Sequence, residues 1–442
     1  MHGFAAWIFA CAMLCAPGCK KPDWSCSGVS QESPRSDARD ELNRRLGLIP
    51  AEADGRWGKL RAPVNEDLAE LETQIRQLEA LGYASGTKTA PGLSGVTRHD
   101  AGRANDGLNF YVSGHEAAAV LMQMDGQVLH RWARDFWDVW PADRAERSNE
   151  GTHHWRHAEP FENGDLLAIY EGLGLVKLDR SSNVIWARRN GAHHEFEVLP
   201  NGDIAVLVRE ARLIERIDAA RPTLEDFVLI LDSDGREKKR ISVLEAFERS
   251  QEHRRIWDDS PRRWGDLFHT NSIEVLDGRF AGINPAFAKG SFLLSSRHLN
   301  SVFVVSQETG EVVWAMRAAF RAQHDARLLD DGSIMLFDNS GRAGESAVEV
   351  YDPQTLAIRW EYVGSEEKPF YTQFCGASQR LPNGNTLITE SDNGRAFEVT
   401  TDGDIVWEFY NPHRAGENDE FIAALFQMDR LPRDFAKWLP RD

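Results

Sequence analysis

The stretch Asn163-Gly164-Asp165-Leu166-Leu167-Ala168-Ile169 recurs along the chain with small changes. Each copy begins with an Asn-Gly or Asp-Gly turn signal and continues as a short apolar run. Such a signal between apolar runs is typical of a β-hairpin with a type I′ turn, in which both central residues have positive φ. The copies therefore predict repeated antiparallel hairpins. The other copies begin at Asn201-Gly202, Asp331-Gly332 and Asn383-Gly384.

The rest of each repeat predicts two further strands, because a second turn signal follows and the last strand often ends in tryptophan. Four short strands in a unit of roughly 40–50 residues, with almost no helix, are typical of propeller blades. We predict an all-β, six-bladed β-propeller over residues 107–412, with blades that begin near residues 107, 155, 193, 266, 321 and 373. The tryptophans, which we expect to fill the spaces between blades, are Trp132, Trp186, Trp314, Trp360 and Trp407.

A seventh blade would have to come from splitting the region 106–132 or from the segment 244–266. The second of these segments is polar and in part helical, and we interpret it as an insertion. Six blades therefore remain the best count.

Composition and charge limit the classes of partner. The chain has 442 residues, of which 42% are hydrophobic and 10% aromatic, so it can bury a substantial core. Its formal net charge of -18 argues against a general affinity for nucleic acid or anionic membrane surfaces. An anionic substrate must then be held by a few specific groups. Of five cysteines only Cys26 and Cys375 lie beyond residue 19, which argues against a disulfide framework.

The first 19 residues are interpreted as an export signal, because their apolar run is too short to cross a bilayer comfortably. Gly18-Cys19 before two lysines fits lipidation of Cys19, with a simple cleaved signal or an uncleaved anchor as alternatives. We expect an exported protein that is periplasmic or membrane-anchored. Its oligomeric state is left open. The remaining predicted segments are a polar tether over 20–63, an amphipathic helix and linker over 64–106, and a C-terminal tail over 413–442.

A histidine recurs at one position of the repeat. His194 and His324 lie the same short distance before the Asn201-Gly202 and Asp331-Gly332 turns, and His269 precedes Asp277-Gly278 with one residue of slippage. The first strand of a propeller blade is innermost, so residues that open it meet at one rim of the central channel. We therefore expect the three imidazoles to converge.

Other polar residues are expected at this rim. Arg297 ends the second strand of the fourth unit, and Asn271 lies on the same face of its strand as His269. The denser histidine group, His153, His154 and His157, opens the second unit out of register. We expect that group to line the rim or a substrate pocket and not to act in catalysis.

Two classes of function other than group transfer remain open from the residues. Three imidazoles with an open position can bind a catalytic divalent metal. Arg297 argues against this, because a cation beside a metal is costly, whereas it suits an anionic group. The chain could also be a non-catalytic propeller that binds a partner or a small anion.

The motifs Phe268-His269-Thr270-Asn271-Ser272, Ser295-Ser296-Arg297-His298 and Gln323-His324-Asp325, with Leu336-Phe337-Asp338-Asn339, resemble those of the bacterial arylsulfate sulfotransferase (arylsulfotransferase) family. The resemblance covers roughly residues 107–412. It implies a six-bladed periplasmic propeller that moves a sulfuryl group from an aryl sulfate donor to a phenolic acceptor. No nucleotide sulfate donor and no cofactor are implied, and the intermediate is a sulfohistidine.

The resemblance also implies residue roles. His324 matches the histidine that is sulfurylated, His269 and Asn271 match the His-x-Asn pair, and Arg297 matches the sulfate-binding arginine. His194 matches the remaining active-site histidine, with His193 as its fallback.

The chemistry of these side chains is consistent with such roles. A neutral imidazole can attack sulfur in line, and two successive displacements give ping-pong kinetics. Arginine and amide groups can stabilise charge on the non-bridging oxygens. A second histidine can protonate the leaving phenolate and then deprotonate the incoming phenol.

Overall fold

The computed structural model describes residues 88–145, 147, 149–342, 344–415 and 418–439. The predicted export signal over 1–19 with Cys19, the tether over 20–63 and the helix that begins at residue 64 lie outside the described residues. Among the residues that are described, no helix has the length and apolar character needed to span a membrane.

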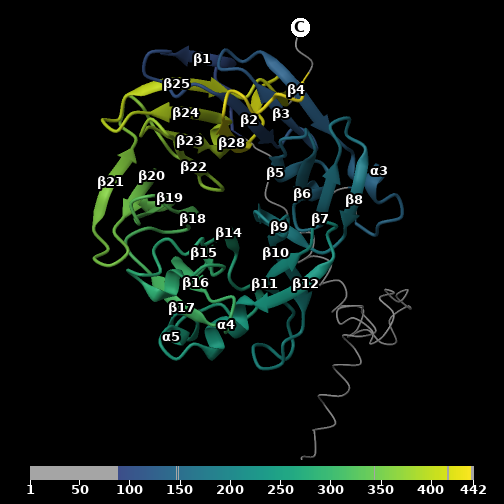
Figure 1. Cartoon of the computed structure of the whole chain (residues 1–442), viewed down its shortest axis with the longest axis vertical. Coiled ribbons are helices and arrows are strands. Elements are labelled where there is room, and N and C mark those ends of the chain that lie inside the picture. Colours follow the sequence, from purple (N-terminus) through teal and green to yellow (C-terminus); the bar gives the residue numbers. More distant parts are fainter. Residues whose placement is uncertain (1–87, 146, 148, 343, 416–417, 440–442) are drawn as a thin grey trace, which may run out of the picture. The chain divides into compact units, whose positions relative to one another are not determined.

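Six small antiparallel sheets are arranged in a ring, which confirms the predicted six-bladed β-propeller (Figure 1). The first strand of each blade lies innermost and lines the central channel. Blade one contains β28 (Leu425–Leu431), β2 (Leu108–Ser113), β3 (Ala118–Met122) and β4 (Val128–Ala133), and blade two contains β5 (Trp155–Pro160), β6 (Leu166–Tyr170), β7 (Gly174–Leu178) and β8 (Val184–Arg188). Blade three contains β9 (Ala192–Val198), β10 (Ile204–Arg212), β11 (Thr223–Leu231) and β12 (Glu237–Ser242), and blade four contains β14 (Thr270–Val275), β15 (Phe292–Ser296), β16 (Ser301–Val305) and β17 (Val312–Met316). Blade five contains β18 (His324–Leu328), β19 (Ile334–Arg342), β20 (Glu345–Tyr351) and β21 (Ile358–Val363), and blade six contains β22 (Ala377–Arg380), β23 (Thr386–Glu390), β24 (Arg395–Val399), β25 (Ile405–Tyr410) and β1 (Gly95–His99).

The elements outside the blades are short. A two-stranded sheet pairs β26 (Arg414–Ala415) with β27 (Phe421–Ile422), and β13 (Gly265–Asp266) runs parallel to β11. The helices are α3 (Phe136–Val139), α4 (Val243–Arg249) and α5 (Arg254–Asp258), with 3-10 turns η1 (Glu150–Thr152), η2 (Pro285–Phe287) and η3 (Ser391–Asn393).

The first hairpin turn of the repeat differs from the predicted type I′ turn. In the first copy only the glycine has positive φ: Gly164 has φ 87°, and Asn163 does not join it. The Gly164 N–H donates to Phe161 O, and the Phe161 N–H donates to Asp165 O, which gives a three-residue loop. Asn163 Oδ1 accepts from the Asp165 N–H at 3.0 Å, and this bond holds the asparagine in its turn conformation. The same bonds recur in the other three copies.

Four of the blade-end tryptophans join their blade to the next one. The Nε1–H of Trp132 in blade one donates to Gly164 O in blade two at 2.8 Å, and Trp407 in blade six reaches Met124 O in blade one at 2.9 Å. Trp186 and Trp360 make equivalent bonds, to Ser233 O and Thr401 O. These contacts place the rings between neighbouring blades, as expected from the repeat.

Strands from beyond the predicted limits complete two of the blades. The innermost strand of blade one is β28, which lies within the predicted C-terminal tail over 413–442. The outermost strand of blade six is β1, which lies within the predicted linker over 64–106. Both assignments are therefore corrected for these residues. Each strand pairs with a partner roughly 300 residues away in the sequence, so no local turn signal reveals the pairing.

The insertion between blades three and four packs against β11, β12 and β17 through its helix α4 (Figure 1). Its helices α4 and α5 bury Phe247 and Trp257 against Phe268, with ring centroids 5.9 Å and 5.1 Å away. Phe268 is fully buried and directly precedes His269. The insertion therefore fixes the backbone from which that histidine projects.

Candidate active site

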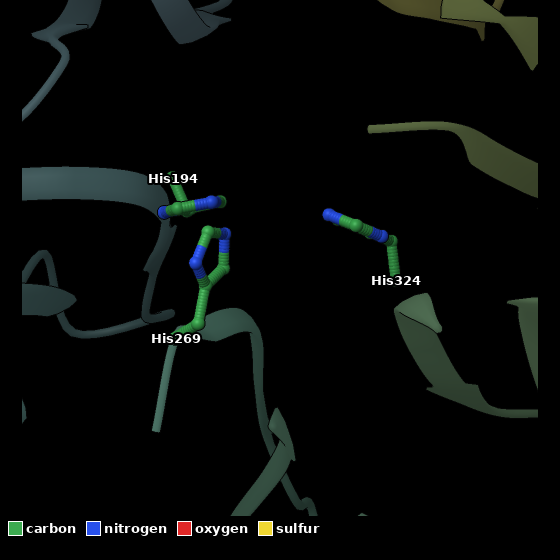
Figure 2. Close-up of side chains that lie close together, drawn as sticks. All are labelled: His194, His269 and His324. Atoms are coloured by element: carbon green, nitrogen blue, oxygen red, sulfur yellow. The ribbon is translucent and has the colours of Figure 1, made fainter. Parts of the chain in front are cut away.

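Three histidines from three neighbouring blades meet at the channel, as the repeat register predicts. His194 lies on β9, His269 directly precedes β14, and His324 opens β18. One nitrogen from each ring lies within 4.8 Å of the other two, and all three side chains are buried. Figure 2 shows His324 facing His194 and His269 across a gap.

An irregular backbone turns these side chains into the channel. His194 and His269 have φ values of 54° and 52°, a conformation that costs a non-glycine residue about 1 kcal/mol or more. A β-bulge interrupts the pairing of the innermost strand in each of blades three, four and five at this level. Bulges redirect side chains at the rims of sheets. The site is therefore built by the same local device three times.

The proton position on His324 is determined by its neighbours. Its Nδ1 lies 2.8 Å from Asn339 Oδ1 and 3.0 Å from Ala322 O. The Asn339 amide donates to Thr372 O and Cys375 O, so its oxygen must face the imidazole. Both neighbours of Nδ1 are acceptors, which puts the proton on Nδ1 and the lone pair on Nε2.

The charge state of His324 follows from its burial. Burial, followed by the nearby His269, lowers the pKa of His324 well below its usual value. His324 is therefore a neutral imidazole with its lone pair on Nε2 at physiological pH.

His269 forms a buried pair with Asp266. The His269 Nδ1 lies 2.7 Å from Asp266 Oδ2, and the His269 N–H donates to Oδ1 at 3.0 Å. Burial opposes ionisation of Asp266, but the charge and hydrogen bond of His269 hold the pKa of this carboxyl well below its usual range. A carboxylate at Nδ1 orients the ring and stabilises its protonated form. This arrangement suits a proton carrier.

His193 supports His194 from behind. The Nδ1 atoms of the two rings are 2.8 Å apart, so one ring donates to the other and their tautomers are coupled. The His194 N–H donates to the buried Glu171 Oε2 at 2.9 Å. Burial lowers the pKa of both histidines well below the usual value. His193 contacts the site through His194. It is not among the described residues that line the channel cavity.

Asn271 and Arg297 occupy different positions around the histidines. Asn271 lines the channel cavity, and its Nδ2 donates to Gln323 O at 2.8 Å. Arg297 is half-buried and directly follows β15; its N–H donates to His269 O at 3.2 Å. Its charge contributes to the lowered pKa of His324, after burial and His269. The positive charge of Arg297 thus acts on the site from the end of β15 in blade four.

A cavity of about 380 Å³ occupies the channel next to the histidines. Residues that open the innermost strands, among them His194, Asn271 and His324, line it together with Arg156. Farther along these strands the lining becomes acidic. The acidic lining residues are Glu195, Glu274, Asp325 and Asp429.

Three residues of this site were missed by sequence reasoning. Asp266 belongs to the insertion, where no repeat register applies. Asn339 stands in the Leu336-Phe337-Asp338-Asn339 run, but its role depends on carbonyls from another blade. Arg156 had a usable signal: it precedes Asn163 by seven residues, the spacing of His194 from its turn. The three neighbouring histidines do not share that register.

Three carboxyls on the innermost strands β5, β9 and β28 predict a pH dependence of stability. Burial raises the pKa of Glu159 and of Glu197 to about 7, and that of Asp429 to about 6. Folding raises the pKa of these carboxyls. Their contribution to the stability of the fold is therefore complete below the unfolded pKa, about 4.5, and is lost as the pH rises through about 7. We expect these carboxyls to lower the free energy of unfolding by roughly 1–3 kcal/mol across this interval. The buried neutral histidines act in the opposite direction, because their lowered pKa values favour folding as the pH rises.

Urea denaturation at about pH 5 and about pH 8 measures the effect. Relative to the wild type, the Glu197→Gln variant should gain stability as the pH rises, because glutamine can still accept the Val275 N–H but does not ionise. A stability difference between the variant and the wild type that does not change with pH contradicts the prediction.

Comparison with known proteins adds one family match. The family model described as arylsulfotransferase (ASST) matches residues 157–412. No curated protein matches the chain. Among solved structures, a protein of unknown function from Bacteroides caccae is 12% identical, with a TM-score of 0.44 over 69% of this chain and 94% of that one. The β-propeller domain of Cps50 (Swd1) from Myceliophteria thermophila is 13% identical, with a TM-score of 0.42 over 77% and 97%.

Proposed function

The chain belongs to the arylsulfotransferase family, and from this premise we propose that it moves a sulfuryl group from a phenolic sulfate ester to a phenolic or other hydroxyl acceptor. The transfer uses no nucleotide sulfate donor and proceeds through a sulfohistidine. The observation that carries this proposal is the neutral His324, whose Nδ1 is held by two acceptors while the His269–Asp266 pair stands opposite.

In the first step His324 Nε2 attacks the sulfur atom of the donor. The N–S bond forms as the bond between sulfur and the phenolic oxygen breaks. The leaving phenolate takes a proton from His269, whose imidazolium form is stabilised by Asp266. The Nδ1–H of His324 stays in place, and Asn339 and Ala322 accept from it as the ring gains positive charge.

In the second step the acceptor hydroxyl attacks the same sulfur. Neutral His269 takes the hydroxyl proton, the N–S bond breaks, and His324 returns to its neutral form. Each step leaves the enzyme ready for the other, which gives ping-pong kinetics. The side chains of Arg297, Asn271 and His194 are proposed to stabilise the non-bridging oxygens in both steps.

The proposal is tested by trapping the intermediate. Incubation with 4-nitrophenyl sulfate in the absence of acceptor should add the mass of one SO3 group to a peptide that contains His324. Addition of a phenol should remove the adduct and produce the aryl sulfate of that phenol. An adduct on another residue, or release of nitrophenol that never depends on acceptor, contradicts the assignment.

A metal centre is the second candidate, because the three ring nitrogens lie within 4.8 Å of one another. The nearby charge of Arg297 disfavours a cation and favours an anion at the same place. Metal analysis of protein purified without chelator separates the two. Stoichiometric zinc, iron or copper that is required for activity would overturn the role of His324 as nucleophile.

The third candidate function is that of a non-catalytic binding propeller, and the enzyme assay tests it. Wild-type protein that binds aryl sulfates but never releases nitrophenol, with any acceptor, would support a binding protein.

We also propose, from the first 19 residues, that the protein is exported and is periplasmic or membrane-anchored.

A further inference from the structure

Arg156 occupies in blade two the position that His194 and His324 occupy in their blades. It lies on β5, seven residues before the Asn163 turn, and His194 and His324 precede their turns by the same distance. The pairing of β5 with β6 is interrupted between Trp155 and His157, so Arg156 is the extra residue of a bulge. The device that turns the histidines into the channel therefore also presents this arginine.

The Arg156 side chain is buried without a counter-ion. Its exposure is 7%, and its Nε is a buried donor with no hydrogen-bond partner. Across the residues that the structure describes, its guanidinium makes no ion pair; it lies over the Phe426 ring, 5.4 Å from the centroid. An uncompensated buried charge is costly unless an anion completes the site.

A second arginine of the same cavity, Arg327, has counter-ions within the protein. Arg327 also lines the cavity, but its guanidinium contacts Glu195 and lies 2.8 Å from Asp325 Oδ1. It also donates to Ile273 O at 2.9 Å. Arg327 is therefore satisfied within the protein, whereas Arg156 is not.

Arg156 acts on the histidines that define the site. It lines the cavity with His194 and His324. Its charge contributes to the lowered pKa of both, after burial and His269 and, for His194, also after His193. A cation at this position favours the neutral state of both rings and attracts an anion to the space between blades two and five. The buried Glu171 accepts from the His194 N–H and makes no ion pair with Arg156 among the described residues.

We propose that Arg156 is a substrate-binding residue that holds the sulfate group of the donor in the channel cavity. The inference rests on the proposed function for the identity of the anion, a sulfate monoester. The planar guanidinium can donate two parallel N–H bonds to two non-bridging oxygens, and the contact with Phe426 limits its orientation. No bond forms or breaks at Arg156. Its charge remains paired with the sulfuryl oxygens while the group moves onto His324 and off again.

Binding of inorganic sulfate tests this subsite without turnover. Wild-type protein should gain thermal stability with increasing sulfate, and Arg156→Gln should bind sulfate about 10–100-fold more weakly, the effect of losing charge-assisted hydrogen bonds. Arg156→Lys keeps the charge but loses the planar fork, and should fall between the two. Arg380→Gln is the matched control, because Arg380 lines the same cavity but donates to Gly384 O and stacks on Trp360.

A structural role and a binding role predict opposite results in sulfate-free buffer. An anion-binding arginine without a partner should leave the stability of Arg156→Gln equal to or above that of the wild type. Lower stability of this variant together with unchanged sulfate affinity would overturn the subsite. If Arg156→Gln does not fold, sulfate binding by Arg156→Lys that equals the wild type overturns the proposal.

The outcomes for the subsite and for the proposed function are separable. Wild-type protein that binds sulfate through Arg156 but never forms a sulfuryl adduct would support the subsite and contradict the proposed function. The same dependence of adduct formation on donor concentration in the wild type and in Arg156→Gln would contradict the subsite and leave the proposed function standing.

Discussion

His324→Ala is expected to lower kcat/KM for 4-nitrophenyl sulfate by at least about a thousandfold, because it removes the atom that we propose bonds to sulfur. Nitrophenol release at saturating phenol measures the loss. The sulfuryl adduct should be absent from this variant. Folding should be retained, since the imidazole is bonded through Nδ1 alone to Ala322 and Asn339.

His153→Ala is the control for the loss of a histidine. His153 belongs to the dense histidine group but is exposed, and its Nε2 lies 2.9 Å from Arg147 O, away from the three site histidines. Its activity should stay within about twofold of the wild type. Substantial transfer by His324→Ala, or an equal loss in His153→Ala, would refute the assigned nucleophile.

His269→Ala is expected to produce the second large loss, and its size should depend on the leaving group. A simple phenol resembles tyrosine, with a pKa of about 10, and needs a proton as it leaves. Sulfate esters of such phenols should react about 100–10,000-fold more slowly in this variant. Nitrophenyl sulfate, whose leaving group is a weaker base, should be affected far less in the step that forms the adduct.

Asp266→Asn should show the same selectivity to a smaller degree. Asparagine can still accept the His269 Nδ1–H but cannot stabilise the imidazolium ion. Single-turnover rates for a series of aryl sulfates measure the dependence. His298→Asn is the matched control, since the His298 Nδ1 lies 3.1 Å from the Asp266 backbone oxygen. Equal losses of single-turnover rate for good and poor leaving groups would contradict a role of His269 in proton transfer.

The fold was predictable because its information is local. Each Asn-Gly or Asp-Gly signal needs only its neighbours to make a hairpin, and the same turn recurs in blades two, three, five and six. The type of turn was predicted incorrectly, because hydrogen bonds of side chains such as Asn163 favour the three-residue loop. Closure by β28 was missed, because its pairing with β2 depends on contacts between the two ends of the chain.

The candidate site was predictable only where it follows the repeat. His194, His269 and His324 share a register, so a repeating backbone brings them together. Arg156 shares it as well, but it stands among three histidines that do not. Asp266 and Asn339 follow no register, because one comes from an insertion and the other acts through carbonyls of residues 372 and 375.

The sequence by itself determined the number of blades, the innermost strand of most of them and the convergence of three histidines, since each of these depends on spacing along one strand. Only the tertiary structure decided which histidine carries its proton on Nδ1, which is paired with a carboxylate, and that Arg156 is buried without a counter-ion. Proton positions and unpaired charges depend on partners from different blades and on burial. Those partners are brought together only when the ring closes.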